Sequence, residues 1–347
     1  MNFRTNPARH LKIVALLVIS AVVLWRLWRG LSWTEMRQSF VQANALLLIF
    51  SLCVSSATNL FRSCRWQVLL APSVTVRMRD VFAATNIGLA GSFIFGNAAG
   101  ELIRPLTLPL LNSKVRRTTA VLTIIVERVF DLSVLCMLFG FGLLRLPLLG
   151  NQFIARAHTT EIGIALLALP PLAIIVLIWF KKHLINRSNR LMEENEPQLT
   201  RGRFGRSVSR FLKQLLRALS VLTDTREFIA VTLWTAVQWL SVVLTNWLVL
   251  RAFGLPFGFK ETILVMCFGL AGSFVPTPGG AAGAFHAAIS GGLVLLGVAL
   301  EKAAAISIAA HLVGFIPALV FGSYFLLRRG VNLAQLQREM HAVAETQ

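Results

Sequence analysis

The sequence predicts an all-α protein: a polytopic bundle of transmembrane helices with two re-entrant or broken helical hairpins in an inverted repeat. Three observations support this fold class. Of 347 residues, 56% are hydrophobic and only 14% are charged, whereas about a quarter of a soluble domain is charged. The apolar residues form blocks of about 20, which is long enough to cross the hydrocarbon core. A six-residue segment also occurs twice, each time before a break rich in small residues. This composition excludes an ordinary soluble enzyme.

The apolar blocks give the expected elements in chain order. We expect membrane spans over residues 11–28, 45–61, 118–146, 162–180, 228–250 and 303–327. Two more regions, 80–111 and 261–300, are apolar but interrupted by Gly and Pro. Together these elements predict a single transmembrane domain over residues 1–327, followed by a polar cytoplasmic tail over 328–347.

The charge balance indicates the orientation of the chain. The sequence has 34 Lys and Arg against 15 Asp and Glu, and cytoplasmic loops of membrane proteins concentrate Lys and Arg. We therefore assign the excess to the cytoplasmic face and not to nucleic-acid binding. The basic stretches from Arg62 to Arg79 and over 181–225 are then cytoplasmic, and so are both termini. The second half of 181–225 has the pattern of an amphipathic basic helix, which predicts contact with anionic lipid.

An internal repeat predicts the two hairpins. Residues Gly88–Phe93 recur letter for letter as Gly269–Phe274. The residues expected to break the helices after each copy are Gly96, Gly100, Pro276, Pro278, Gly279 and Gly280. An interrupted helix survives in a membrane only when it is buried in protein or lines a wet cavity, and broken helices at matching positions of two halves are typical of a transporter site. The alternative is a pair of ordinary kinked helices.

Several charges fall inside the predicted membrane region, and they are the candidate binding residues: Glu101, Arg104, Glu127, Arg128 and Asp131. Each costs roughly 2.5–3.5 kcal/mol at mid-bilayer on insertion scales, so we expect them to face inward and to pair. Arg104 with Glu101 and Arg128 with Asp131 are the local options. Two Arg and three acids leave one negative charge. A polar cavity for an ionic headgroup or a proton relay is the functional interpretation, and a buried ion network that only locks the helices is the structural one.

Two histidines lie in apolar segments, His286 just after the second break and His311 in the last span. Either could titrate near neutral pH or bind a metal. No Cys, His or Asp spacing around them fits a metal site, so we predict no metal and no cofactor. A hydrogen-bonded packing role is the alternative, and it is favoured for His311. His286 joins the candidate binding residues.

Three motifs resemble the lysylphosphatidylglycerol synthase transmembrane family, also called flippase-like membrane proteins. They are Gly100-Glu101-Leu102-Ile103-Arg104, Glu127-Arg128-Val129-Phe130-Asp131 and Pro276-Thr277-Pro278-Gly279-Gly280. The resemblance implies a bacterial inner-membrane protein that moves or handles lipid, with these charged residues at the headgroup site. Its better-known members carry a fused aminoacyl transferase domain, for which this chain has no room. Family members often have Glu where this chain has Ala284-Phe285-His286.

The leading functional hypothesis is a lipid translocator for a phospholipid, hopanoid or polyprenyl-linked lipid. Lipid-biosynthesis enzymes are possible partners. One alternative is a membrane-embedded aminoacyl or glycosyl transferase component that uses Glu127 or Asp131 as a base, but no nucleotide or metal motif supports it. The other is a scaffold for a lipid pathway that transports nothing. The sequence therefore favours a transporter over an enzyme.

Overall fold

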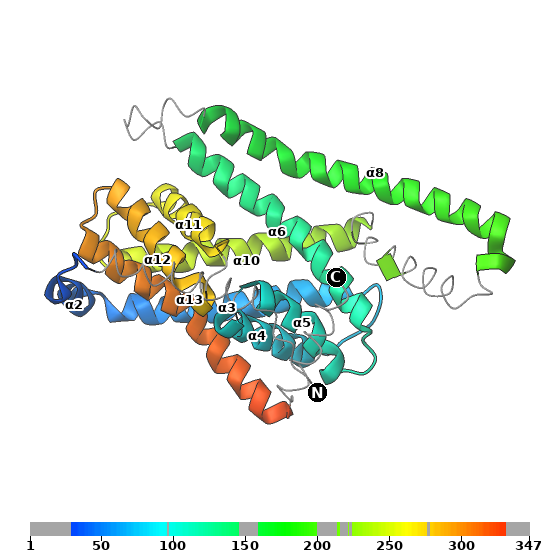
Figure 1. The fold of residues 1–347 in the computed structure, drawn as a ribbon, viewed down its shortest axis with the longest axis horizontal. Helices are drawn as coiled ribbons and strands as arrows, with labels where there is room; N and C mark the ends of the chain where they lie inside the picture. Colours follow the sequence, from blue (N-terminus) through cyan, green and yellow to red (C-terminus); the bar gives the residue numbers. More distant parts are fainter. Residues whose placement is uncertain are drawn as a thin grey trace, which may run out of the picture. The chain divides into compact units, whose positions relative to one another are not determined.

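The computed structural model of the chain describes residues 29–95, 97–145, 159–199, 214–215, 221, 224–275 and 278–330. They form α2 (Trp33–Gln42), α3 (Ala45–Leu70), α4 (Met78–Phe95), α5 (Asn97–Leu111), α6 (Arg117–Arg145), α8 (Thr159–Leu199), α10 (Thr225–Ala252), α11 (Phe259–Ser273), α12 (Pro278–Leu295) and α13 (Leu300–Arg329), as Figure 1 shows. Outside the described residues lie the expected first span, the breaks Gly96 and Pro276, most of the basic segment after residue 199, and nearly all of the tail.

The predicted all-α fold is confirmed over the described residues. By length and composition, α3, α10 and α13 are long and apolar enough to cross a membrane. Large apolar side chains on these helices are exposed, among them Leu46 at 77% and Leu240 at 68%. Such exposure is costly in water and natural in lipid, where the surroundings are as apolar as the side chain. The chain is therefore an integral membrane protein.

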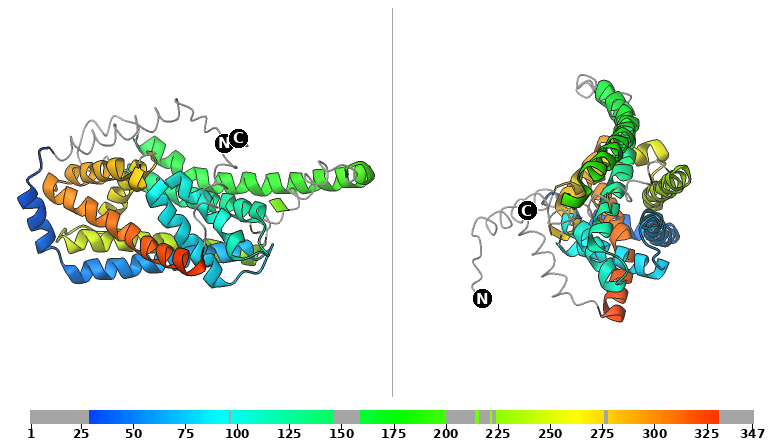
Figure 2. Two further views of the ribbon diagram at one scale, coloured as in Figure 1. Left: turned by 60° about the horizontal axis from the view of Figure 1, so that its bottom comes forward. Right: turned by 90° about the vertical axis from the view of Figure 1, so that its right-hand side faces the viewer.

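The helix α8 is longer than predicted, because it does not stop at Phe180. It continues to Leu199 as one helix of 41 residues, about 60 Å long at 1.5 Å per residue, and Figure 2 shows it as one continuous element. Residues 181–199 are rich in Lys, Arg, Leu, Met and Glu, which all favour helix. The end of the apolar block at Phe180 therefore does not mark the end of the helix.

The helices α6 and α8 pack closely through glycine. A β carbon at Gly140 would lie 2.8 Å from the carbonyl oxygen of Gly163, and one at Gly163 would lie 3.0 Å from that of Gly140. Absent side chains at both positions let the two backbones approach, as is usual between membrane helices.

The chain packs as two compact units. Unit 1 takes its described residues from Met1–Ala57, Asn86–Ile103 and Ser241–Phe325, and unit 2 takes them from Thr58–Thr85, Arg104–Leu240 and Leu326–Gln347. Unit 1 has an apolar core that includes Leu250, Ile289 and Ile306. The core of unit 2 includes Trp66 and Phe130. Each unit thus buries a core of its own.

Each of the two Gly-rich regions folds as a pair of helices, and the residues through which the helices of a pair contact each other belong to unit 1. A β carbon at Gly91 of α4 would overlap the side chain of Ile103 of α5, and one at Gly100 would overlap Ser92, reaching 2.5 Å from its backbone nitrogen. In the second region, a β carbon at Gly272 of α11 would lie 2.6 Å from the carbonyl oxygen of Ala284 of α12. We call these pairs the first hairpin and the second hairpin.

The two hairpins share one register. Met78 and Phe259 begin α4 and α11, and their offset (259 − 78 = 181) equals that between the repeated segments, which start at Gly88 and Gly269 (269 − 88 = 181). One close glycine contact in each hairpin obeys the same offset, because Gly91–Ile103 maps onto Gly272–Ala284. The flanking helices α3 and α10 begin within one residue of it. The repeat therefore extends well beyond the six identical letters.

A charge pair joins two helix ends of unit 2. Arg329 in the last turn of α13 lies 2.9 Å from Asp80 in the first turn of α4. A cation at a helix C-terminus and an anion at a helix N-terminus each interact favourably with the helix dipole. This pair therefore stabilises both ends.

Candidate functional site

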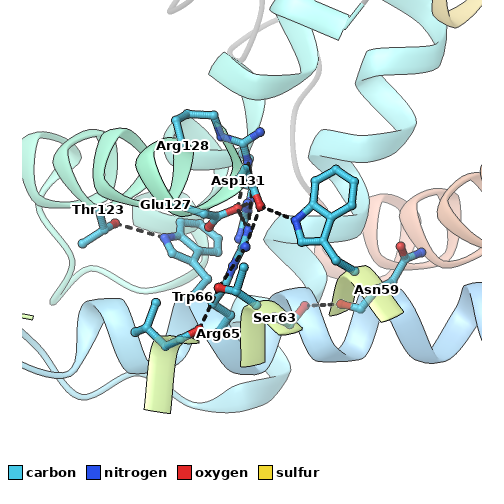
Figure 3. Close-up of polar contacts among 12 residues, drawn as sticks. Asn59, Ser63, Arg65, Trp66, Thr123, Glu127, Arg128 and Asp131 are labelled. Atoms are coloured by element: carbon cyan, nitrogen blue, oxygen red, sulfur yellow. Dashed lines mark hydrogen bonds and ion pairs between the residues drawn. The ribbon is translucent and has the colours of Figure 1, made fainter. Parts of the chain in front are cut away.

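A buried arginine of α3 organises a cluster of charges in unit 2. Arg65 is fully buried and donates from Nη2 to Glu127 Oε1 at 2.8 Å and from Nη1 to Asp131 Oδ1 at 2.6 Å. Glu127 and Asp131 lie four residues apart on α6, so one face of that helix presents both carboxylates to Arg65. Figure 3 shows the three side chains converging between α3 and α6. A buried charge is tolerated only when it is paired in this way.

Two more arginines meet the same glutamate. Arg104 of α5 donates to Glu127 Oε1 at 2.7 Å, and Arg128 donates to the same oxygen at 2.9 Å. Arg128 also lies 3.1 Å from Asp131 Oδ2, the local pair expected from the sequence. One carboxylate oxygen therefore accepts from three guanidinium groups. We call Arg65, Arg104, Glu127, Arg128 and Asp131 the ion cluster.

Aromatic and hydroxyl side chains hold the ion cluster in place. The indole of Trp239 on α10 donates to Asp131 Oδ1 at 3.1 Å. The guanidinium of Arg104 lies 4.2 Å from the ring centroid of Trp66, close enough for a cation–π interaction. Trp66 is itself fixed, because its indole donates to Thr123 Oγ1 at 3.0 Å. These contacts pre-orient the charged side chains.

The side chains of the ion cluster are buried, with one exception. The side chain of Arg128 is 35% exposed, whereas those of the other four members are at most 5% exposed. Several buried atoms of the cluster have no hydrogen-bond partner among the described residues: Nε and Nη2 of Arg104, Nε of Arg65 and Oε2 of Glu127. Leaving such a group unpaired costs about 1–3 kcal/mol, and more when it is charged. The cluster thus has unused donors on Arg104.

Four of the six predicted binding residues come together here, and one member was missed. The sequence ended the second span at Phe61 and left Arg65 outside it, and this end is wrong because α3 continues to Leu70. The apolar letters Trp66, Val68, Leu69 and Leu70 after Arg65 could have revealed the longer helix. The expected negative surplus changes too. Three Arg against two acids make the ion cluster formally positive by one.

The other two predicted residues, Glu101 and His286, belong to unit 1. Glu101 is half-buried on α5. His286 is buried, and its Nδ1 lies 3.2 Å from Ser307 Oγ on α13. No group of three His, Cys, Asp or Glu side chains that could hold a metal occurs in the part of the chain that the structure describes.

Helices long and apolar enough to cross a membrane, together with a buried cluster of charges, define the class as a polytopic membrane protein. Residues 13–322 match the family model described as the lysylphosphatidylglycerol synthase TM region, so the chain belongs to that family. The predicted family is thereby confirmed, and with it a lipid-related function. Searches of curated proteins and of solved structures found no significant match.

Proposed function

We propose that this protein translocates lipid and that the ion cluster binds an anionic headgroup. The observation that supports this most strongly is the crowding on Glu127. Its Oε1 accepts from Arg65, Arg104 and Arg128, while its Oε2 has no partner among the described residues. Three guanidinium groups aimed at one oxygen form a site for an anion with several oxygens, since guanidinium binds carboxylate and phosphate in a two-pronged manner.

In this proposal the carboxylate of Glu127 occupies the arginines of the ion cluster until the headgroup binds. When no headgroup is bound, its carboxylate neutralises the arginines, as a buried charge requires. An arriving anion competes for Arg104 and Arg128, and the half-exposed Arg128 is where it first makes contact. Arg65 stays with Asp131, so the carboxylates never lose their cation. The headgroup then crosses a polar site while its chains remain in lipid.

The repeat argues against a purely structural ion network. At the common offset, Arg65 and Arg104 correspond to Asn246 and Phe285. Residues 308–312, which correspond to Glu127–Asp131, contain no acid, Lys or Arg. The second hairpin nevertheless packs in the same register as the first. Since apolar replacement of buried ion pairs is often neutral or stabilising, the scaffold does not need these charges.

The proposal extends to features that frame the site. Residues 1–327 would act as one transmembrane domain in the bacterial inner membrane, with both termini cytoplasmic. Both hairpins would be re-entrant, one from each face, and Glu101 would contact the lipid headgroup. Enzymes that make the lipid would be partners. The arrangement of short-loop charges and the small-residue contacts of both hairpins support this placement.

Lipid movement in reconstituted vesicles tests the proposal. Fluorescent phosphatidylglycerol and phosphatidylcholine analogues would be followed from one leaflet to the other with wild type, Arg104→Gln, Arg104→Lys and Arg116→Gln. Arg116 is exposed just before α6, so its variant is the matched loss of one positive charge outside the cluster. We expect Arg104→Gln to lose at least about tenfold in rate, the equivalent of one charged hydrogen bond, and Arg104→Lys to keep part of it.

Two results would overturn this function. Folded Arg104→Gln protein that moves the anionic lipid as fast as wild type would remove the ion cluster from the mechanism. A lipid whose mass changes when protein and cell extract are supplied, with no movement between leaflets, would favour the transferase alternative.

A further inference from the structure

We infer that His286 and His311 together bind one proton and that this proton is the ion coupled to headgroup movement. The coupling rests on the proposed function, but the proton site does not. Both histidines are buried, at 8% and 5% exposure, and their ring centroids lie 4.9 Å apart. They come from different helices, α12 of the second hairpin and α13. We call them the histidine pair.

Hydrogen bonds fix the tautomer of His286. The hydroxyl of Ser307 donates its single proton to the carbonyl oxygen of Ala304 at 2.7 Å. Its oxygen can therefore only accept from His286 Nδ1, which lies 3.2 Å away. Neutral His286 thus carries its proton on Nδ1, and Nε2 keeps a lone pair. That lone pair is a proton acceptor within the bilayer.

Aromatic rings surround the second member of the pair. The His311 ring centroid lies 4.6 Å from that of Phe315, 5.1 Å from that of Phe285 and 6.0 Å from that of Phe93. The faces of such rings attract cations within about 6 Å. An imidazolium is therefore tolerated here. Two imidazolium groups are not, because like charges about 5 Å apart repel strongly in a low dielectric. The histidine pair holds one proton at most.

The position of the pair explains how a proton would influence movement. Phe93 belongs to the repeated motif of the first hairpin, Phe285 and His286 to the second, and His311 to α13. Protonation therefore changes a contact shared by both hairpins. The motif residue Phe274, equivalent to Phe93, is 66% exposed and is therefore not buried as part of such a cluster. His311 also lies in the stretch 308–312, which corresponds to the charged turn Glu127–Asp131 of α6.

Other titratable groups on the same elements of unit 1 are few. The α4 residues of unit 1 carry none, α5 carries Glu101, and α11 carries Cys267 near its middle. At the ends of α11 and α13 lie Lys260, Glu261, Glu301 and Lys302, with Tyr324 near the end of α13.

The first arm of the test measures proton binding without transport. Histidine resonances of ¹⁵N-labelled full-length protein in nanodiscs would be followed against pH for wild type, His286→Asn, His311→Phe and His183→Gln. Asn keeps a donor for Ser307, Phe keeps the aromatic packing, and His183 is exposed on α8 as the control. We expect one coupled protonation that both pair variants change and that His183→Gln leaves intact. Two independent protonations, or none, would overturn the proton site.

The second arm measures coupling in sealed vesicles. A gradient of about one pH unit biases the distribution of a lipid at most about tenfold for each proton carried with it. We expect wild type and His183→Gln to show this bias and His311→Phe to move lipid equally in both directions. Wild type that moves lipid but ignores the gradient would overturn the coupling alone. No lipid movement by wild type would overturn the proposed function and leave the proton site to the first arm.

Discussion

Nη2 of Arg65 lies 2.8 Å from Oε1 of Glu127 although 62 residues separate them in the chain. This contact fastens α3 to α6 in the interior of unit 2. Replacing Arg65 by Met leaves two buried carboxylates with less compensation. Breaking a buried pair from one side costs about 3–5 kcal/mol, and we expect a loss of that order in the free energy of unfolding. Denaturation of the purified protein in mild detergent measures it. An Arg65→Met protein as stable as wild type would show that the carboxylates do not depend on Arg65.

Removing all four buried charges together should restore what the single change destroys. We expect Arg65→Met and Arg104→Met combined with Glu127→Gln and Asp131→Asn to recover most of the lost stability, because no buried charge of the ion cluster then remains unpaired. This quadruple variant should still fail to move anionic lipid. The two measurements together separate a structural from a functional role: recovered stability with recovered transport would make the ion cluster a structural lock.

The first hairpin depends on the missing side chain of Gly100. In Gly100→Ala the added methyl meets the backbone of Ser92, which cannot rotate away. Overpacking of this kind costs about 1–3 kcal/mol. Gly291→Ala on α12 is the matched control, because a β carbon there meets nothing within 4 Å, and Ala favours helix over Gly. Thermal unfolding in detergent should drop for the first variant and hold or rise for the second. Equal effects would contradict the close approach of α4 and α5.

The crossing of α6 and α8 should open when Gly163 is replaced by Leu. A β carbon already lies 3.0 Å from the carbonyl oxygen of Gly140, so a larger side chain forces the helices apart. Leu144 and Leu167 flank this crossing. Spin labels attached to cysteines at these two positions would report the separation of the helices as a distance, which should increase in the Gly163→Leu background. An unchanged distance would mean that the helices adjust without separating.

The ion pair Asp80–Arg329 should tolerate reversal poorly, because the helix dipoles favour its present orientation. Asp80→Arg combined with Arg329→Asp restores the attraction but puts each charge at the wrong helix end. We expect the double variant to stay about 1 kcal/mol less stable than wild type. Full recovery would show that direct attraction alone matters. Unfolding midpoints of both single variants and the double variant provide the comparison.

The sequence predicted the spans and most of the charged site, but it missed one helix end and one member of the ion cluster. Apolar blocks located the spans because membrane helices are selected by composition. The end of α8 was mislocated, since helix propensity continues past Phe180 where hydropathy does not. Glu127, Arg128 and Asp131 were found because three charges in one apolar run are conspicuous. Arg65 was missed because it lies beside Arg62, and basic residues near a span end normally indicate a cytoplasmic boundary.

The constant offset of 181 residues between the hairpins has an evolutionary consequence. A common register from helix starts to glycine contacts is what duplication of one ancestral gene would leave, and the ancestor would have paired with a second copy of itself. In the present chain the ion cluster belongs to the first copy and the histidine pair to the second, so the two copies have different side chains for different roles. Two half-length chains, separated between α6 and α10 and expressed together, should therefore find each other in the membrane.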